Sequence, residues 1–259
     1  MLRGLVTAMR TLTILPVPGR EADGMADALP WFPLAGGLTG LLVYGLSRGI
    51  GLVSGDWAGG AAATALVAGV LLTRGFHLDG LADWADGFGG GRDRAHTLAI
   101  MKDSRVGSFG VLAVLVVLLL KYVALLRLAG TGALHLIVPV FIVSRTVPVD
   151  LSVRLPYARP EGGTAAPFVE GARPFHRTAA LLAALVLLLA LSGWRGWVLL
   201  AVGMAASRLL GSWFRRRVGG VTGDLLGAAC ELVETGLLFA CAAAGGWAPP
   251  FPGWRIFTI

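Results

Sequence analysis

Charge is scarce in this sequence of 259 residues: 14% of them are Asp, Glu, Lys or Arg, whereas 56% are hydrophobic. Such a composition excludes a soluble globular domain, a disordered chain and a coiled coil with charged heptads. The sequence also lacks a Gly-X-Y repeat, which excludes collagen. Together with a mean hydropathy of +0.75, these features predict an integral membrane protein.

Cysteine is equally rare, and the common ATP-binding motifs are missing. The two cysteines, Cys230 and Cys241, lie eleven residues apart in one apolar stretch. On a helix they would be about 16 Å apart, too far for a disulfide, so we expect small apolar residues rather than a redox or metal pair. Neither a Walker A motif nor a kinase signature occurs, so ATP is not the expected phosphoryl donor.

Apolar stretches long enough to cross about 30 Å of hydrocarbon dominate what is present. Seven of them lie near 31–52, 57–78, 107–128, 133–150, 178–194, 196–213 and 223–244. The fifth and sixth are short and separated by a tight turn, so six or eight crossings are the alternatives. Residues 2–13 place apolar side chains at helical spacing, which predicts an amphipathic helix on the membrane surface. We therefore predict an all-α, polytopic membrane protein with about seven transmembrane helices, in which residues 1–259 form a single transmembrane domain.

The basic residues behind the net charge of +7 lie unevenly between these stretches. Fourteen occur in one set of alternate connections, whereas the other set holds only Arg195 and Arg255. By the positive-inside rule this predicts a cytoplasmic N-terminus, an external C-terminus and an odd number of spans. The loops 79–106, 151–177 and 214–222 would then face the cytoplasm and carry the chemistry. We expect contact with membrane lipid and no binding of nucleic acid.

Three aspartates stand at the expected cytoplasmic end of the second span. Asp79, Asp83 and Asp86 have i, i+4, i+7 spacing, which puts their carboxylates on one face if the helix continues through them. A solvated helix end is the alternative, but negative charge is unfavourable at a helix C-terminus. A divalent cation would relieve the repulsion, and oxygen-only ligands favour Mg²⁺ over zinc. His77, just before them, is a candidate base, a hydrogen-bond donor to the ligands or an interfacial residue.

Glycines and basic residues follow the aspartates. Backbone amides of consecutive glycines can approach a phosphate closely, and basic side chains supply charge for its oxygens. The candidate substrate-binding residues in this segment are Gly89, Gly90, Gly91, Arg92, Lys102 and Arg105. A flexible loop with positive-inside charges is the alternative. Asp103 is either a fourth carboxylate of the site or the ion-pair partner of the neighbouring basic residues.

A second glycine-rich segment opens the last span. Gly220 and Thr222 are expected to hold an anion at the helix N-terminus, with Thr222 as its cap. Asp224, on the first turn, should lie beside the earlier aspartates, because both groups stand at cytoplasmic ends of spans. Glu231 lies two turns deeper on the same face and is a further catalytic candidate. The alternative for Glu231 is an ion pair with a residue such as Lys121.

These groups together predict Mg²⁺-dependent phosphoryl transfer on a pyrophosphate-linked substrate. An acceptor hydroxyl would attack phosphorus with the help of a carboxylate or histidine base. The candidate catalytic residues are His77, Asp103, Asp224 and Glu231, and the candidate metal ligands are Asp79, Asp83 and Asp86.

The same segments resemble the adenosylcobinamide-GDP ribazoletransferase (cobalamin synthase) family. The likeness runs in order through residues 10–18, 32–37, 77–94, 100–110 and 219–228, and Trp84 departs from it where a small residue or Thr is usual. The resemblance implies a multi-pass enzyme of the bacterial inner membrane, late in corrinoid biosynthesis. Its substrates would be the corrinoid nucleotide adenosylcobinamide-GDP and α-ribazole or its 5′-phosphate, with GMP released and Mg²⁺ as cofactor. A homo-oligomer, or a complex with other corrinoid enzymes, is left open.

Two other functions share parts of this pattern. A CDP-alcohol phosphotransferase also sets spaced aspartates at a membrane face, but its Asp-Gly-x-x-Ala-Arg pattern is not present at Asp79. A cation-coupled transporter would explain acids deep in the last span, but not the aspartates beside glycines.

Overall fold

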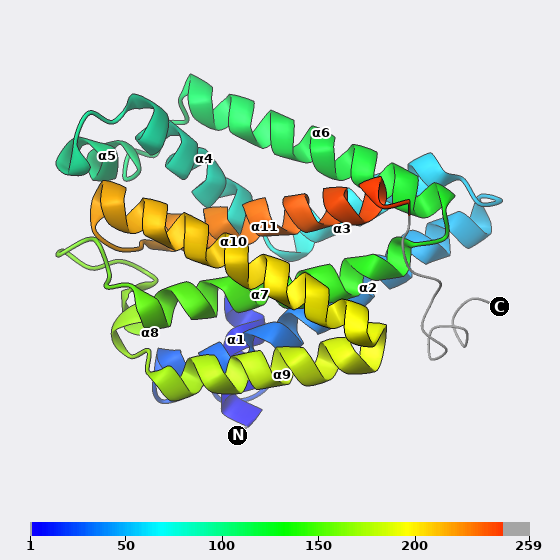
Figure 1. Ribbon diagram of the computed structural model, residues 1–259, viewed down its shortest axis with the longest axis horizontal. Helices are drawn as coiled ribbons and strands as arrows, with labels where there is room; N and C mark the ends of the chain where they lie inside the picture. Colours follow the sequence, from blue (N-terminus) through cyan, green and yellow to red (C-terminus); the bar gives the residue numbers. More distant parts are fainter. Residues whose placement is uncertain (1, 246–259) are drawn as a thin grey trace.

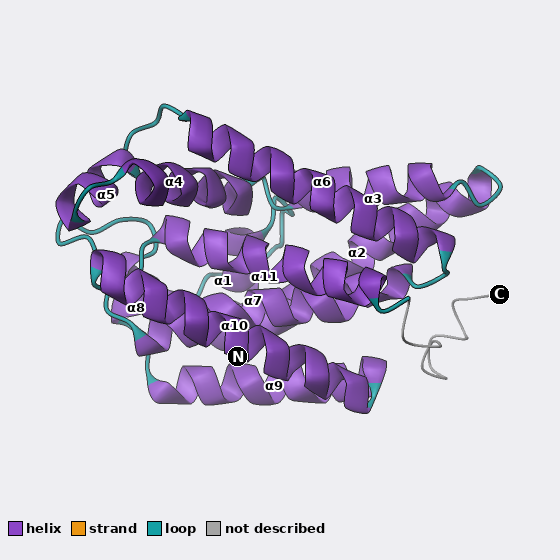
Figure 2. Ribbon diagram, turned by 45° about the horizontal axis from the view of Figure 1, so that its top comes forward, coloured by secondary structure: helices purple, strands orange, loops and turns teal. Residues whose placement is uncertain are grey.

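The computed structural model describes residues 2–245, and all the regular elements in that range are helical (Figures 1 and 2). The elements are α1 (Leu2–Leu12), the 3-10 helix η1 (Met25–Trp31), α2 (Phe32–Val53), α3 (Ala58–Leu72), α4 (Phe76–Gly90), α5 (Arg94–Ile100), α6 (Ser108–Gly130), the 3-10 helix η2 (Leu134–Leu136), α7 (Ile137–Arg154), α8 (Ala166–Glu170), α9 (Pro174–Ser192), α10 (Trp194–Val218) and α11 (Gly223–Ala243). The predicted all-α class is confirmed.

Six segments are long and apolar enough to cross a membrane: Met25–Val53, Ser108–Gly130, Leu134–Arg154, Pro174–Ser192, Trp194–Val218 and Gly223–Ala243. The helices α3 and α4 add a seventh span only if they are counted together. The tight turn expected between the fifth and sixth stretches is a single residue, Gly193, whose φ of 58° is left-handed. Arg255, used above in the orientation argument, lies outside the described residues.

The second span differs from the prediction. The stretch near 57–78 was expected as one span, but α3 ends at Leu72 and α4 begins at Phe76, with an angle of 84° between them. A single helix, α4, does continue through Asp79, Asp83 and Asp86, as their common face requires. Arg74 and Gly75 make the bend with φ values of 55° and 67°, in the left-handed region. Asp79 therefore lies in the first turn of a new helix, where negative charge is favourable, rather than at the end of an old one.

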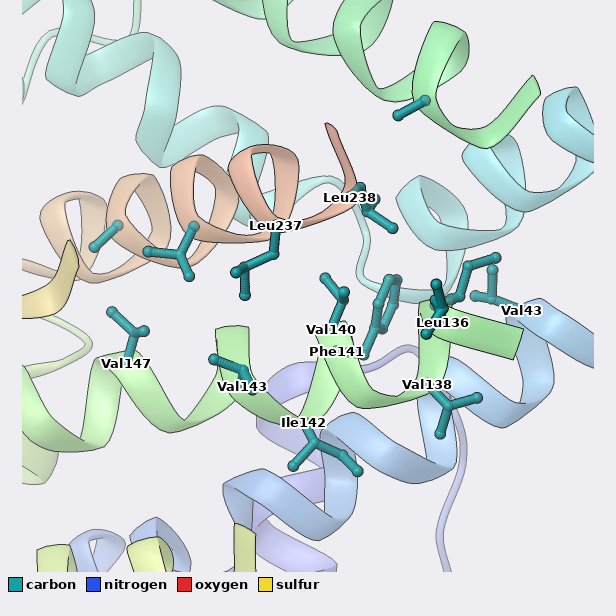
Figure 3. Packing of buried hydrophobic residues seen from close by; sticks show 14 of the residues in the cluster. Val43, Leu136, Val138, Val140, Phe141, Ile142, Val143, Val147, Leu237 and Leu238 are labelled. Carbon is teal, nitrogen blue, oxygen red and sulfur yellow. The ribbon is translucent and has the colours of Figure 1, made fainter. Parts of the chain in front are cut away.

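The core is built around α7. In the candidate span Leu134–Arg154, which contains this helix, 94% of the most apolar part is buried inside the protein. Figure 3 shows Val138 and Ile142 of α7 directed toward α2, and Leu237 of α11 above the opposite side of α7. Glycine permits the close approach of α2: a Cβ atom at Gly36 would lie 2.5 Å from the Phe141 carbonyl oxygen. Small residues of this kind bring helix backbones together in membranes.

The amphipathic N-terminal helix exists, but its buried side contacts protein. Ala8, Met9 and Leu12 of α1 are buried in a cluster that includes Leu29 of η1 and Phe32 of α2. Helix α1 thus packs on the bundle near the start of α2, a contact that the sequence did not predict, and its position on the membrane surface stays a prediction. A strong amphipathic pattern indicates that one face of a helix contacts apolar groups, but it does not show whether these belong to lipid or to a neighbouring helix.

The long connections gather at one end of the bundle, the left side in Figure 1. They include the end of α4 with α5, the segment from α7 to α9, and the turn from α10 to α11. The opposite end carries short turns at 54–57, 131–133 and 193. The loops that share basic residues in the sequence therefore share one end of the molecule.

Candidate active site

Hydrogen bonds from arginines join the three clustered loops into one structure. Arg94 donates to the Ala158 carbonyl at 3.2 Å, and Arg159 donates to the Met101 carbonyl at 3.2 Å. Arg217, at the end of α10, donates to the Gly91 carbonyl. These hydrogen bonds hold together loops 79–106, 151–177 and 214–222. Even the two residues nearest in sequence, Arg159 and Met101, are 58 positions apart.

The turn before α11 is fixed by backbone pairing. Val221 donates its amide to the Pro156 carbonyl at 2.9 Å and accepts from the Ala158 amide at 2.8 Å. A side chain at Gly220 would collide with the Pro156 carbonyl, so only glycine permits this approach. Thr222 is the N-cap of α11 and accepts a hydrogen bond from the Leu225 amide at 3.3 Å, which confirms the predicted cap.

Asp224 lies where α11 crosses α4. A Cβ atom at Gly80 would be 2.7 Å from the Asp224 carbonyl oxygen, so the two helices touch between Asp79 and Asp83. The Asp83 carboxylate is half-buried, and the charges of Asp224 and Asp79 both act on it unfavourably. The structure therefore brings Asp224 beside Asp79 and Asp83, as the sequence predicted.

Arg159 is the cation that the sequence argument missed at this point. Its guanidinium donates to Asp224 at 2.8 Å, and the Thr222 hydroxyl donates to the same carboxylate oxygen at 3.2 Å. Asp79 and Asp83 have no ion pair among residues 2–245. One cation therefore faces three carboxylates, which leaves net negative charge at the crossing of α4 and α11.

Asp86 has a different environment from the two other aspartates of α4. Its carboxylate accepts hydrogen bonds from the amides of Gly107 and Gly110, at 2.6 and 2.9 Å. These amides open α6, so Asp86 stabilises the N-terminus of that helix. Both of its oxygens are occupied by protein donors, and metal binding by Asp86 stays a prediction.

The carboxylates of Asp79 and Asp83 suit a magnesium ion that takes only some of its ligands from the protein. Within the part of the chain that the structure describes, no group of three or more His, Cys, Asp and Glu side chains could enclose a metal. Mg²⁺ in phosphoryl-transfer sites usually has only one or two carboxylate ligands and takes the others from water and substrate phosphates. Asp79 and Asp83, unpaired and next to Asp224, match that requirement.

The glycine segment forms the end of α4 and is not a flexible loop after it. Gly89 and Gly90 belong to the last turn of α4, and the Gly91 amide donates to the Gly87 carbonyl at 2.9 Å. A Cβ atom at Gly89 would lie 2.8 Å from the Phe109 ring. These glycines therefore admit close packing by protein groups, and a phosphate-binding role for them stays untested.

The charged side chains of the same loop are largely paired or solvent-exposed. Lys102 forms an ion pair with Glu161 at 3.4 Å, and Arg92 is exposed. Arg105 hydrogen-bonds Asp103, which lowers the pKa of that carboxyl to about 2. A general base is most effective with a pKa near the working pH. The alternative role of Asp103, as an ion-pair partner, is the one that the structure shows.

Glu231 lies in a buried ion network that connects α6, α7 and α11. Lys121 of α6 contacts both Glu231 and Glu234, and Arg145 of α7 contacts Glu234. The two acids and two bases balance, as buried charges in a membrane require. The predicted alternative of an ion pair with Lys121 is confirmed, and the deep acids that a cation transporter would use are already neutralised. Catalysis by Glu231 stays untested.

His77 lines a cavity together with Asp79 and Asp224. The cavity has a volume of about 330 Å³ and reaches Asp79, Asp224 and His77. The His77 side chain is buried, and its Nδ1 atom has no hydrogen-bond partner among residues 2–245. Sequence spacing suggested His77 through its position before Asp79, but the cavity walls from α1, η1 and α8 have no signal in the sequence.

Comparisons with known proteins identify the family of the chain. The family model described as cobalamin-5-phosphate synthase matches residues 4–242. An adenosylcobinamide-GDP ribazoletransferase of Chlorobaculum parvum is 49% identical over 245 residues, 93% of this chain and 96% of its own. The proteins with the same name from Chlorobaculum tepidum and Roseiflexus sp. are 48% and 39% identical, over 93% and 88% of this chain and 96% and 84% of their own. No solved structure matches. The chain belongs to the CobS family of cobalamin-5-phosphate synthases.

Proposed function

We propose that this protein is an adenosylcobinamide-GDP ribazoletransferase, which joins adenosylcobinamide-GDP to α-ribazole or α-ribazole 5′-phosphate and releases GMP. The observation that carries the proposal is the crossing of α4 and α11, which brings Asp79 and Asp83 together with Asp224 at the capped N-terminus of a helix. Carboxylates for a metal and a helix N-terminus for a phosphate are the two parts that a diphosphate exchange needs.

In the proposed reaction a hydroxyl of the ribazole attacks the phosphorus that carries the cobinamide. A new phosphate ester bond forms there, the bond to the bridging diphosphate oxygen breaks, and GMP leaves with that oxygen. Asp79 and Asp83 would hold Mg²⁺, which supplies charge for the diphosphate and the departing phosphate. Asp224, oriented by Arg159 and Thr222, lies within the same group and would hold the attacking hydroxyl or take its proton.

The other polar groups of this end would bind the anionic parts of the substrates. Arg92, Lys102 and Arg105 are exposed around the loop after α4 and offer positive charge to phosphates. His77 lines the same cavity as Asp79 and would contact the acceptor. The resulting site is shared by loops 79–106, 151–177 and 214–222.

The decisive assay supplies both substrates to the purified protein in detergent. We expect GMP and the cobalamin product to form in equal amounts with Mg²⁺ present. Chelation of Mg²⁺ should stop the reaction, and added Mg²⁺ should restore it. Release of CMP from a CDP-alcohol, with no reaction of adenosylcobinamide-GDP, would overturn the proposal.

Orientation gives a separate prediction: the site end should face the cytoplasm, because it carries the basic loops. In a background with Cys230→Ala and Cys241→Ala, we expect Ala95→Cys to be protected from an impermeant maleimide added outside intact cells. Ala95 lies on the exposed surface of α5. The matched control is Trp57→Cys, an exposed position at the opposite end of the bundle, which should be labelled from outside. Labelling of position 95 from outside, without labelling of position 57, would show that the site end faces outward and would contradict this prediction.

A further inference from the structure

The cavity beside the aspartates has an apolar interior that the phosphoryl chemistry does not use. Its volume is about 330 Å³, at the lower end of the roughly 300–1,000 Å³ of small-molecule sites. Apart from His77, Asp79, Asp224, three small polar residues and two glycines, its walls are Leu12, Leu29, Phe32, Phe76, Pro148, Ala165, Phe168 and Leu226. Such a lining suits a compact ring system with few polar atoms.

Two of the residues that line this cavity, His77 and Ser152, have a buried side-chain polar atom without a partner. The Nδ1 atom of His77 and the Oγ atom of Ser152 make no hydrogen bond to any described residue, although the two side chains are only 2% and 3% exposed. Buried polar atoms are nearly always hydrogen-bonded, so each of these two atoms calls for a partner that the described residues do not supply, and a ligand atom is one. His77 comes from α4 and Ser152 from α7, so the two partners reach the cavity from different helices.

We propose that this cavity holds the benzimidazole base of the ribazole acceptor, an inference that rests on the proposed function. The base has two methyl groups for the apolar walls and one free ring nitrogen, which accepts a hydrogen bond. The Ser152 hydroxyl or the His77 ring can donate that bond. The aromatic rings of Phe32, Phe76 and Phe168 offer surfaces for a planar ligand.

The other parts of the two substrates fit this cavity poorly. A corrin ring with its amide side chains is far larger than a site at the lower end of the small-molecule range. Guanine has an amide and an amino group, which would need several partners, whereas the interior offers two unpaired polar atoms. The benzimidazole therefore matches both the size and the polarity of the space.

Position adds a second argument. Asp79 and Asp224 line the same cavity as Ser152, so a base bound inside leaves its ribose at the carboxylates. The attacking hydroxyl belongs to that ribose. One ligand can thus satisfy the buried polar atoms and present its hydroxyl to the diphosphate of the other substrate, which would approach from the loop side.

The first test uses the wild-type enzyme in detergent. We expect 5,6-dimethylbenzimidazole to compete with α-ribazole in the steady-state assay but not with adenosylcobinamide-GDP. Benzimidazole, which lacks both methyl groups, should inhibit roughly tenfold more weakly, because less apolar surface is buried. Competition with adenosylcobinamide-GDP, or no inhibition by either base, would overturn the assignment.

The second test changes the cavity itself. Ser152→Ala should raise KM for α-ribazole about tenfold with kcat and KM for adenosylcobinamide-GDP unchanged, because one hydrogen bond to the base is lost. Ala165→Leu should fill part of the cavity and raise the same KM further. Ser47→Ala is the matched control: Ser47 is a buried serine whose hydroxyl bonds the Ala61 carbonyl outside this cavity, and its loss should leave both KM values unchanged.

The outcomes separate the two proposals. An unchanged KM for α-ribazole in folded Ser152→Ala and Ala165→Leu proteins would reject the base site while the transferase activity stands. A raised KM for adenosylcobinamide-GDP instead would assign the cavity to that substrate. Failure of the wild-type enzyme to form cobalamin would reject the proposed function, whatever the inhibition by benzimidazoles. The inhibition experiment needs no variant, so a misfolded variant does not remove the test.

Discussion

Asp83→Asn is expected to lower turnover by about a hundredfold or more, equivalent to about 2.7 kcal/mol of lost transition-state stabilisation. Asp83 is half-buried between Asp79 and Asp224 and has no ion pair among the described residues. In the proposed site it holds Mg²⁺, and asparagine keeps its shape while removing its charge. Relief of carboxylate repulsion should leave the folded protein as stable as before, or more so. The measurements are the initial rate of GMP release at saturating Mg²⁺ and the Tm in detergent.

Asp86→Ala is the matched comparison on the same helix. The change leaves the amides of Gly107 and Gly110 without their acceptor, so we expect a loss of stability of about 2 kcal/mol. Its signature is a lowered Tm, whereas that of Asp83→Asn is a lowered rate without a lowered Tm. Near-normal rates and an unchanged Mg²⁺ requirement in Asp83→Asn would remove this carboxylate from the metal site.

Lys121→Met is expected to destabilise the protein by about 3–5 kcal/mol, because it leaves a buried charge without its partner. Lys121 contacts Glu231 and Glu234, and Arg145 remains only for Glu234. Thermal unfolding in detergent measures the effect. The matched variant is Lys121→Met with Glu231→Met, which removes the unpaired acid and should recover most of the lost stability.

The same double variant distinguishes two roles of Glu231. The hydrogen bonds of the ion network join Lys121, Ser144, Arg145, Glu231 and Glu234, and none of those described reaches Asp79, Asp83 or Asp224. We therefore expect the double variant to keep its turnover. Lost turnover in a folded double variant would instead support the catalytic role suggested by the sequence. Full stability of Lys121→Met alone would show that the network contributes little.

Much of the membrane architecture could be predicted, because a bilayer imposes a simple requirement of length and apolarity on each span. The hydropathy pattern that follows from this requirement does not reveal where a span bends. Hydropathy averages over Arg74 and Gly75, so the break before α4 and the favourable placement of Asp79 at a helix start were missed. The packing of α1 against η1 and α2 was also missed, because an apolar helix face has the same sequence pattern against lipid and against protein.

The candidate site was partly predictable for a related reason. Asp224 and Asp83 could be placed together because both lie at the same end of adjacent spans. The contact of Arg159 with Asp224 depends on how two loops fold against each other, which a single sequence does not encode as a pattern. The capping role of Asp86 was hidden in the same way, since its partners are backbone amides at Gly107 and Gly110.

The buried ion network also constrains how the protein is made. Helices α6 and α7 are synthesised before α11, so Lys121 and Arg145 leave the ribosome well ahead of Glu231 and Glu234. An unpaired cation in the hydrocarbon is costly. A nascent chain truncated before α11 would therefore have two uncompensated charges within the bilayer, and stable insertion of its middle helices depends on the arrival of the last one.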